Sequence, residues 1–383
     1  MTTATKERKT AKRSAGTVIG RAELLEALGH IQPATTGARI RPILSNVLLH
    51  DGWITAMDDE IRIDCRIEWE CDPLLLPYQR LAAILREVKD EEVELRPDGT
   101  SCLVKVKRGE WRLPVEKAEE FPLWDPSGLK PMPLIPADQF SRACHSVISA
   151  ADGESGRYTL GGVLFEVSRD KGKCWLVATD GRRLSCAEMD LPMGRDVDDA
   201  NPIVPRHAMS AIQKIADTYG KDGKPVDFEA SENEIVASFE RHRVSARLMQ
   251  GQFPRWKDVF PSVRESVEHE IGHDVLASAT RAAAIVTSEQ SKGVLFTFSD
   301  GTLTLSAEST ESGRSEVEVE VESYGSDGFV KLDPRFVKDV IAGLPTKNGE
   351  PTVSVSVGGP GDAVVFSYGQ GGEYRSVVMP LAD

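Results

Sequence analysis

The sequence predicts an α+β fold built from three similar domains. An apolar strand opening recurs at residues 46–49, 162–165 and 293–296. A strand end that runs into a helix beginning at proline recurs at Pro77, Pro205 and Pro334, at intervals of 128 and 129 residues. Each copy closes on an apolar residue followed by proline, in Phe121-Pro122, Phe253-Pro254 and Met379-Pro380. A repeat of this length is the size of a small domain rather than of a solenoid turn.

Each repeat supplies two helical stretches. The first helices are expected at residues 21–31, 136–149 and 274–287. The second helices are clearer, because their apolar residues recur on one face. These stripes are Leu81, Ile84, Leu85 and Val88; Met209, Ile212 and Ala216; and Phe336, Val340 and Leu344. Proline suits the start of such helices, since its missing N–H would be unpaired there. We therefore expect six helices, each burying one face against a sheet.

The segments between the helices are predicted to be paired strands. Residues 53–67 break at Asp58-Asp59, residues 175–188 at Asp180-Gly181, and residues 302–321 near residues 311–313. Asp-Gly between two alternating strands is a strong hairpin signal. In the last segment Glu316, Glu318, Glu320 and Glu322 alternate with Val317, Val319 and Val321. This alternation predicts one acidic, solvated sheet face and one face toward the core.

The composition is that of a cytoplasmic protein. The chain has 383 residues, of which 40% are hydrophobic and 28% charged, enough for two or three domains with cores of their own. Six cysteines without a C-x-x-C pair argue against a zinc ribbon or a disulfide framework and predict reduced, mostly buried thiols. No apolar run approaches the roughly 20 residues of a membrane span. The N-terminus is too polar for a secretory signal.

We place the domain boundaries at residues 17–130, 131–262 and 263–383, after a disordered basic tail at residues 1–16. The tail is rich in Thr, Ala, Lys and Arg and lacks apolar periodicity. It has two interpretations, a solvated end without a role or an auxiliary phosphate contact. The second would use Lys6, Arg8, Lys9, Lys12 and Arg13.

The charge is segregated. A net charge of −14 ordinarily counts against binding of nucleic acid, because phosphates repel an acidic surface. The predicted helices, however, carry nine Lys or Arg residues against seven acidic ones. With Arg39, Arg41, Arg157 and His207 in adjoining positions, this suggests a helix-lined surface that faces a polyanion. A sequence-specific DNA reader would carry a denser basic patch or a recognition motif, and neither is present.

Five segments together resemble one protein family. They are residues 157–166, 177–184, 203–206, 251–254 and 377–381, which include Gly161-Gly162-Val163, Thr179-Asp180-Gly181-Arg182-Arg183 and Val378-Met379-Pro380. In order and spacing they resemble the bacterial DNA polymerase III beta subunit family, the sliding clamps, from about residue 21 to residue 383. The resemblance implies three clamp domains, with helices lining a central hole and antiparallel sheets outside. Two copies would close head to tail into a ring around duplex DNA.

The resemblance also implies the partners. These are double-stranded DNA bound without sequence preference, the DNA polymerase III catalytic subunit, an ATP-dependent clamp loader, other proteins with a clamp-binding motif, and a second copy of the chain. The chain would be a nucleoid-associated processivity factor with no catalytic site, cofactor or metal. In agreement, it lacks a phosphate-binding loop, a dinucleotide fingerprint and a nucleophile elbow.

Three sets of site residues follow from the resemblance. The lumen candidates for DNA binding are Arg39, Arg41, Arg157, Arg206 and His207. The pocket for a short apolar partner peptide corresponds to Leu160, Thr179, Gly181, Arg183, Leu184, Pro254, Val259, Val378, Met379, Pro380 and Leu381. The dimer interface would pair Trp111 and Leu113 with Ile285 and Val286. Packing within a domain is the rival explanation for each apolar residue. Asp258 and Asp383 depart from the basic residues usual in the family, so peptide preference would differ.

Two other functions compete with this hypothesis. The run His269-Glu270-Ile271-Gly272-His273 matches the H-E-x-x-H pattern of zinc peptidases. That site needs both histidines on one helix face and a third ligand, but residues 267–271 are predicted to be a strand, and only Glu289 offers a distant ligand. The other alternative is a repeat scaffold that does not bind DNA, which the acidic net charge favours.

Overall fold

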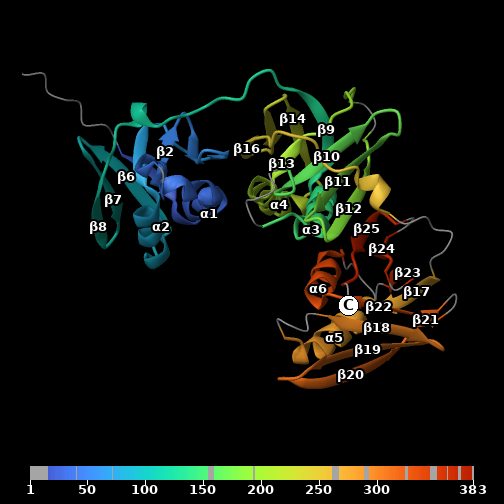
Figure 1. Cartoon of the computed structure of the whole chain (residues 1–383). Helices are drawn as coiled ribbons and strands as arrows, with labels where there is room; N and C mark the ends of the chain where they lie inside the picture. The colour runs from blue at the N-terminus through green and yellow to red at the C-terminus, as the bar shows by residue number, and fades with distance from the viewer. Residues whose placement is uncertain are drawn as a thin grey trace, which may run out of the picture. The chain divides into compact units, whose positions relative to one another are not determined.

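The computed structural model describes residues 16–39, 41–70, 72–153, 159–192, 195–260, 267–288, 293–323, 327–345, 352–359, 361–369 and 372–381. All but the last residue of the predicted basic tail lies outside these ranges. Contacts divide the chain into two compact units. The first comprises Met1–Pro126 with Ser238–Ser245, and the second Ser127–Ala237 with Ala246–Asp383. Each unit is described by itself (Figure 1).

The first unit contains the first repeat, with two helices and two sets of antiparallel strands. One sheet has the order β1-β6-β7-β8, and the other strands follow the order β5-β2-β3-β4. The strands are β1 (Thr17–Gly20), β2 (Asn46–His50), β3 (Trp53–Met57), β4 (Ile61–Arg66), β5 (Leu74–Pro77), β6 (Glu92–Asp98), β7 (Ser101–Val106) and β8 (Gly109–Pro114). The helices are α1 (Arg21–Ile31) and α2 (Tyr78–Glu87), with short 3-10 turns η1 (Gln32–Arg39), η2 (Pro42–Ser45) and η3 (Ala118–Glu120).

A short segment of the second repeat, Ser238–Ser245, packs within the first unit. It includes the start of β16 (His242–Arg247). Its backbone is bonded to the end of β4, where the Arg66 amide donates to the Arg241 carbonyl at 2.7 Å. The Arg241 side chain also pairs with Glu23 of α1. His242 reaches the interior, where only 6% of its surface is exposed.

The second unit contains most of the second repeat and all of the third that is described. Its helices are α3 (Ala137–Ile148), α4 (Arg206–Gly220), α5 (His273–Ala283) and α6 (Pro334–Gly343), with 3-10 turns η4 (Trp256–Val259) and η5 (Ala284–Val286). The second-repeat strands are β9 (Lys130–Pro136), β10 (Gly162–Ser168), β11 (Lys173–Thr179), β12 (Arg183–Asp190), β13 (Ile203–Pro205), β14 (Pro225–Ala230) and β15 (Glu234–Ser238).

The third-repeat strands are β17 (Val267–Gly272), β18 (Val294–Ser299), β19 (Thr302–Ser309), β20 (Gly313–Glu320), β21 (Glu322–Ser323), β22 (Gly328–Leu332), β23 (Thr352–Val357), β24 (Val364–Tyr368) and β25 (Tyr374–Val378). One sheet runs β20-β19-β18-β22. A nine-stranded sheet runs β13-β10-β11-β12-β25-β24-β23-β17-β21. The second and third repeats are therefore joined at a shared seam, where β12 pairs with β25.

Helix packing in the second unit follows from the sequence pattern. On α3, Phe140, Cys144 and Val147 are fully buried at helical spacing. Phe140 contacts Phe228 of β14 with ring centroids 4.9 Å apart. The last residue of α6, Gly343, approaches the end of α3 so closely that a Cβ would lie 3.1 Å from the Ser146 Cα and carbonyl oxygen. α6 of the third repeat thus packs directly on α3 of the second (Figure 1).

All six predicted helices and the three strand breaks are confirmed, but the proline landmarks need correction. Only Pro334 is the first residue of a helix; Pro77 and Pro205 end strands β5 and β13 and act as N-caps. Both strands lie at sheet edges, where a missing N–H breaks no ladder bond. Phe121-Pro122, Phe253-Pro254 and Met379-Pro380 lie outside strands.

The predicted end of α5 and the predicted acidic face are also refined. α5 ends at Ala283 rather than near residue 287, because the amide and hydroxyl of Thr287 both donate to the Ala284 carbonyl and close a tighter turn. Glu316, Glu318 and Glu320 are exposed as expected, but Val317 and Val319 are only half-buried, since β20 is an edge strand. The five cysteines in the described residues are buried. No helix in those residues combines the length and apolarity needed to cross a bilayer.

Candidate partner site and nucleic-acid surface

The seam between the second and third repeats brings most of the predicted pocket residues close in the fold. In the antiparallel pairing of β12 with β25, Arg183 lies opposite Val378 and Leu184 opposite Val377. Thr179, at the end of β11, pairs with Leu184. Beyond β25, the Met379 amide donates to the Arg182 carbonyl at 2.9 Å. The predicted C-terminal segment is thereby fixed against the turn between β11 and β12.

The turn between β11 and β12 is built around Asp180. One oxygen, Oδ1, accepts the amides of Arg182 and Arg183 at 2.9 and 3.0 Å. The Thr179 hydroxyl donates to the Arg183 carbonyl at 2.7 Å and accepts the Gly181 amide at 3.1 Å. Gly181 has a φ of +84°, a conformation that glycine adopts without steric cost. The Asp-Gly signal therefore forms a rigid turn.

Arg183 is the best-connected residue of the seam. Its Nε donates to Asp180 Oδ2 at 3.1 Å, its Nη2 to the Ser149 carbonyl at 2.5 Å, and its Nη1 to Asp339 Oδ2 of α6 at 2.6 Å. The guanidinium also lies over the ring of Phe336, with the carbon 4.7 Å from the centroid. Only 10% of the side chain is exposed. One cation thus contacts both repeats.

The segment around η4 covers the neighbouring face of β10 to β12. Trp256 is 5% exposed and donates from Nε1 to Glu166 Oε2 at 2.8 Å. Lys257 pairs with Glu166 and lies 5.0 Å from the rings of both Trp175 and Trp256, a cation–π arrangement. Leu184 and Val377 belong to the same apolar cluster as the two tryptophans. The η4 segment is therefore held to the seam.

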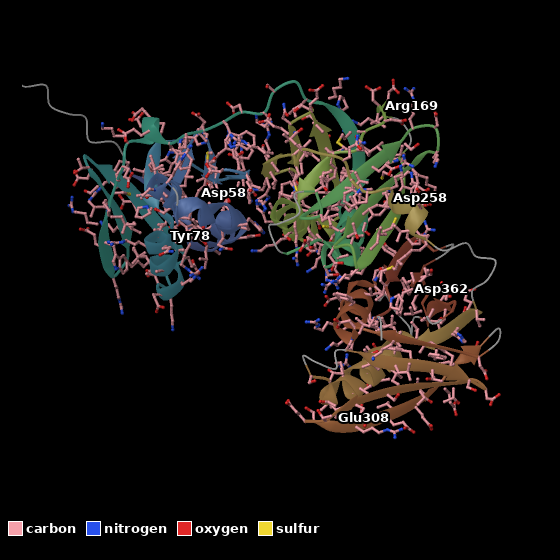
Figure 2. All side chains as sticks on the ribbon, in the orientation of Figure 1. Asp58, Tyr78, Arg169, Asp258, Glu308 and Asp362 are labelled. Atoms are coloured by element: carbon pink, nitrogen blue, oxygen red, sulfur yellow. The ribbon has the colours of Figure 1, made fainter. Side chains whose placement is uncertain are left out.

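The predicted pocket residues divide by exposure. Val259 and Met379 expose 39% and 42% of their surface, large fractions for apolar side chains. Pro254, Gly181 and Asp258 are also exposed, and Asp258 is marked on η4 in Figure 2. Leu160, Pro380 and Leu381 are half-buried. Thr179, Leu184 and Val378 are buried and shape the site from beneath. Asp383 lies outside the described residues.

Sequence reasoning missed a groove beside this region. It encloses about 600 Å³ and is lined in part by Leu164, Phe253, Pro254 and Trp256. Pro254 is the one predicted pocket residue that lines it. The available signal was the run Gly251-Gln252-Phe253-Pro254, whose half-buried phenylalanine lies in a loop.

The predicted DNA-binding residues are placed only in part. Arg157 and the side chain of Arg39 lie outside the described residues. Arg41 is exposed in the first unit, 3.9 Å from Asp59. In the second unit Arg206 is exposed at the first position of α4, where its amide donates to the Gly161 carbonyl at 3.1 Å, and His207 is half-buried.

The predicted interface residues lie at sheet edges or beside them. Trp111 and Leu113 are on β8, an edge strand of the first unit; Trp111 is half-buried and Leu113 is buried. Ile285 on η5 exposes 79% of its surface and Val286 is half-buried. The end of α5 is bonded to the acidic edge strand β20, where the Ser315 hydroxyl donates to the Ala283 carbonyl at 2.8 Å.

The zinc-peptidase pattern is split between two elements. His269 lies on β17, 1% exposed and stacked on Phe298 at 4.0 Å between ring centroids, and burial lowers its pKa. His273 begins α5, with Nε2 2.9 Å from the Ile341 carbonyl. The predicted strand is confirmed, and the two rings do not share a helix face. The described residues contain no group of three metal-ligating side chains suited to an ion.

Comparisons with known proteins identify the family. Models of the DNA polymerase III beta subunit match its N-terminal domain at residues 17–125, its central domain at 134–255 and its C-terminal domain at 257–381. The beta sliding clamp of Caulobacter vibrioides is 28% identical over 334 residues, covering 84% of this chain and 88% of the relative. The beta sliding clamp of Escherichia coli K12 is 28% identical over 358 residues, covering 88% and 93%.

Solved structures agree with the sequence comparisons. The beta sliding clamp of Caulobacter crescentus superimposes with a TM-score of 0.84 at 26% identity, over 96% of this chain and 99% of that one. The beta subunit of Thermotoga maritima, at 21% identity, shares the fold with a TM-score of 0.85 over 96% and 99%. The chain therefore belongs to the DNA polymerase III beta subunit family, the sliding clamps.

Proposed function

We propose that two copies of this chain close head to tail into a ring around duplex DNA and tether the DNA polymerase III catalytic subunit and other DNA-processing proteins to it. The observation that carries this proposal is the succession of three beta-subunit domains over residues 17–381. Head-to-tail contacts close into a ring when the rotation between copies divides a full turn. Encirclement then replaces tight binding as the source of retention.

Opposite charges on two edge strands support a head-to-tail contact. Around β8 the exposed side chains Lys105, Lys107, Arg108 and Arg112 outnumber Glu110. On β20 the exposed side chains Glu316, Glu318 and Glu320 are acidic, and only Arg314 opposes them. An unpaired edge offers backbone groups to another strand, and complementary charge favours the correct partner. Ile285, with Val286 beside it, supplies apolar area to bury.

The DNA contacts in this proposal are weak and numerous. Arg41, Arg206 and His207, together with Arg39 and Arg157, would face the phosphates through long, mobile side chains. Contacts to phosphate carry no sequence information and weaken as salt rises. A ring that is held by topology can therefore slide.

The partner surface would be the exposed apolar residues at the seam. Val259, Met379 and Pro254 flank the turn at Gly181, and methionine adapts to more than one ligand. A short apolar peptide needs only two or three anchors there to bind. Asp258 would disfavour peptides that carry an acidic residue near it.

We assign the chain no catalytic role, so a ring made of it needs an ATP-dependent clamp loader to open. Such a ring works in the cytoplasm on the nucleoid. The rival function, a repeat scaffold without DNA, has in its favour the net charge of −14.

Topological retention tests the proposal. The protein is loaded on a nicked circular plasmid with its clamp loader and ATP, washed at high salt, and then one sample is linearised. We expect the protein to stay on the circle and to leave the linear DNA, because only a closed duplex traps a ring. Equal retention on circular and linear DNA would contradict encirclement, and no retention on either would favour the scaffold.

A further inference from the structure

The contacts of Arg183 connect the partner surface to a helix in the other repeat. Its backbone pairs with Val378 in the seam, one residue before the exposed Met379. Its side chain ends at Asp339 on α6, 2.6 Å away. Three donors of the guanidinium are already bonded within the chain, and one ring face is covered by Phe336. Arg183 is thus occupied by internal contacts rather than open to a ligand.

Of these contacts, the one with Asp339 is the easiest to alter. Asp180 is 16% exposed on its side chain and its other oxygen already holds two amides of the turn. The carboxylate of Asp339 is 47% exposed. An ion pair that is open to water on one side contributes little to stability. It can still fix a direction, because an arginine–carboxylate contact is directional.

The contact also crosses between two packed bodies. α6 carries Asp339 and Phe336, and its last residue, Gly343, abuts Ser146 of α3. Ser149, which directly follows α3, accepts from Arg183 Nη2. A change at Asp339 therefore alters how α6 and the turn between β11 and β12 meet, and the backbone of that turn holds Met379.

We propose that Arg183 is a positioning residue that locks α6 to the β11–β12 turn, and that Asp339 thereby sets the affinity of the surface around Met379 for an apolar peptide without touching that peptide. This inference rests on the proposed function, since the peptide surface is part of it.

The test measures binding of a short, uncharged, fluorescently labelled peptide that carries two leucines and a phenylalanine. Asp339→Asn removes the charge, Asp339→Glu keeps a carboxylate, and Lys338→Gln is the matched control one residue away on α6. We expect Asp339→Asn to weaken binding by about three- to tenfold, the size of a modest coupling between neighbouring residues. Asp339→Glu should recover part of the loss, and Lys338→Gln should bind as the original chain does.

Salt provides a readout that a merely structural role would not move. Raising the salt to about 1 M shortens the screening length to about 3 Å. The affinity of the original chain for the uncharged peptide should then fall toward that of Asp339→Asn, whose own affinity should not change. Equal peptide affinity of the original chain and Asp339→Asn would overturn the inference alone. Absence of binding by the original chain would overturn both the inference and the proposed peptide site.

Discussion

Two places where segments of different repeats meet use different chemistry. In the first unit, Ser238–Ser245 from the second repeat is buried through His242, beside His30 and Cys65. At the β12–β25 seam of the second unit, the contact depends on the charged Arg183 and on a hydrogen bond between the hydroxyls of Ser185 and Ser376 at 2.8 Å. The two contacts should therefore fail under different conditions.

The histidine contact is held by neutral groups. Nε2 of His242 lies 3.0 Å from Nδ1 of His30 and 3.1 Å from Sγ of Cys65, and the two rings meet edge to face at 4.6 Å. Burial lowers the pKa of His242 to about 3, and nearby His30 and Arg241 lower it further. Burial likewise raises the pKa of the Cys65 thiol to about 12. A proton, rather than salt, is what this contact cannot accept.

The largest effect is expected at the seam. Arg183→Met leaves the mostly buried Asp180 without its cation and the Ser149 carbonyl without its donor. Removing one partner of a buried ion pair costs about 3–5 kcal/mol, and the exposure of Asp339 reduces this to about 2–3 kcal/mol. Hydrogen exchange of the β12 and β25 amides measures the free energy of opening.

The matched control for that experiment is Arg182→Met. Arg182 is exposed, and its carbonyl and amide, rather than its side chain, make the contacts of the turn. We expect its opening free energy to change by less than about 0.5 kcal/mol. Equal protection in the two variants would show that the guanidinium does not hold the seam.

An acid effect of intermediate size is expected in the first unit. Folded His242 stays neutral, whereas the unfolded chain binds a proton below the ordinary value of 6.5. Stability is therefore full above that value and falls as the pH drops toward 3. Between about pH 6.5 and pH 5.5 the loss from this group is about 1.4 kcal/mol. Denaturant unfolding of the first unit at both pH values measures it.

His242→Gln isolates the contribution of that imidazole. The variant should show a shallower loss of stability over the same pH interval, because the titrating group is gone, whatever its stability at neutral pH. His50→Gln, also in the first unit, serves as the control and should keep the original slope. An unchanged slope in His242→Gln would assign the acid sensitivity to other groups.

The sequence predicted local features better than the contacts that join them. Helical stripes and the Asp180-Gly181 signal gave all six helices and the hairpin, because periodicity and turn chemistry act within a few residues. The interface of Arg183 with Asp339 spans 156 residues and that of His242 with Cys65 spans 177. No local pattern encodes such pairs. For the same reason, the proline landmarks marked strand ends rather than helix starts, since proline is tolerated at an edge strand.

The smallest effect concerns Asp339 and separates fixing a direction from supplying stability. Because its carboxylate is 47% exposed, water and salt screen its attraction to Arg183. We expect Asp339→Asn to lower the free energy of opening of the seam by less than about 1 kcal/mol, well below the effect of Arg183→Met. The same exchange measurement on β12 and β25 applies. A loss as large as that of Arg183→Met would mean that Asp339, rather than Asp180 and Ser149, carries the stability of the seam.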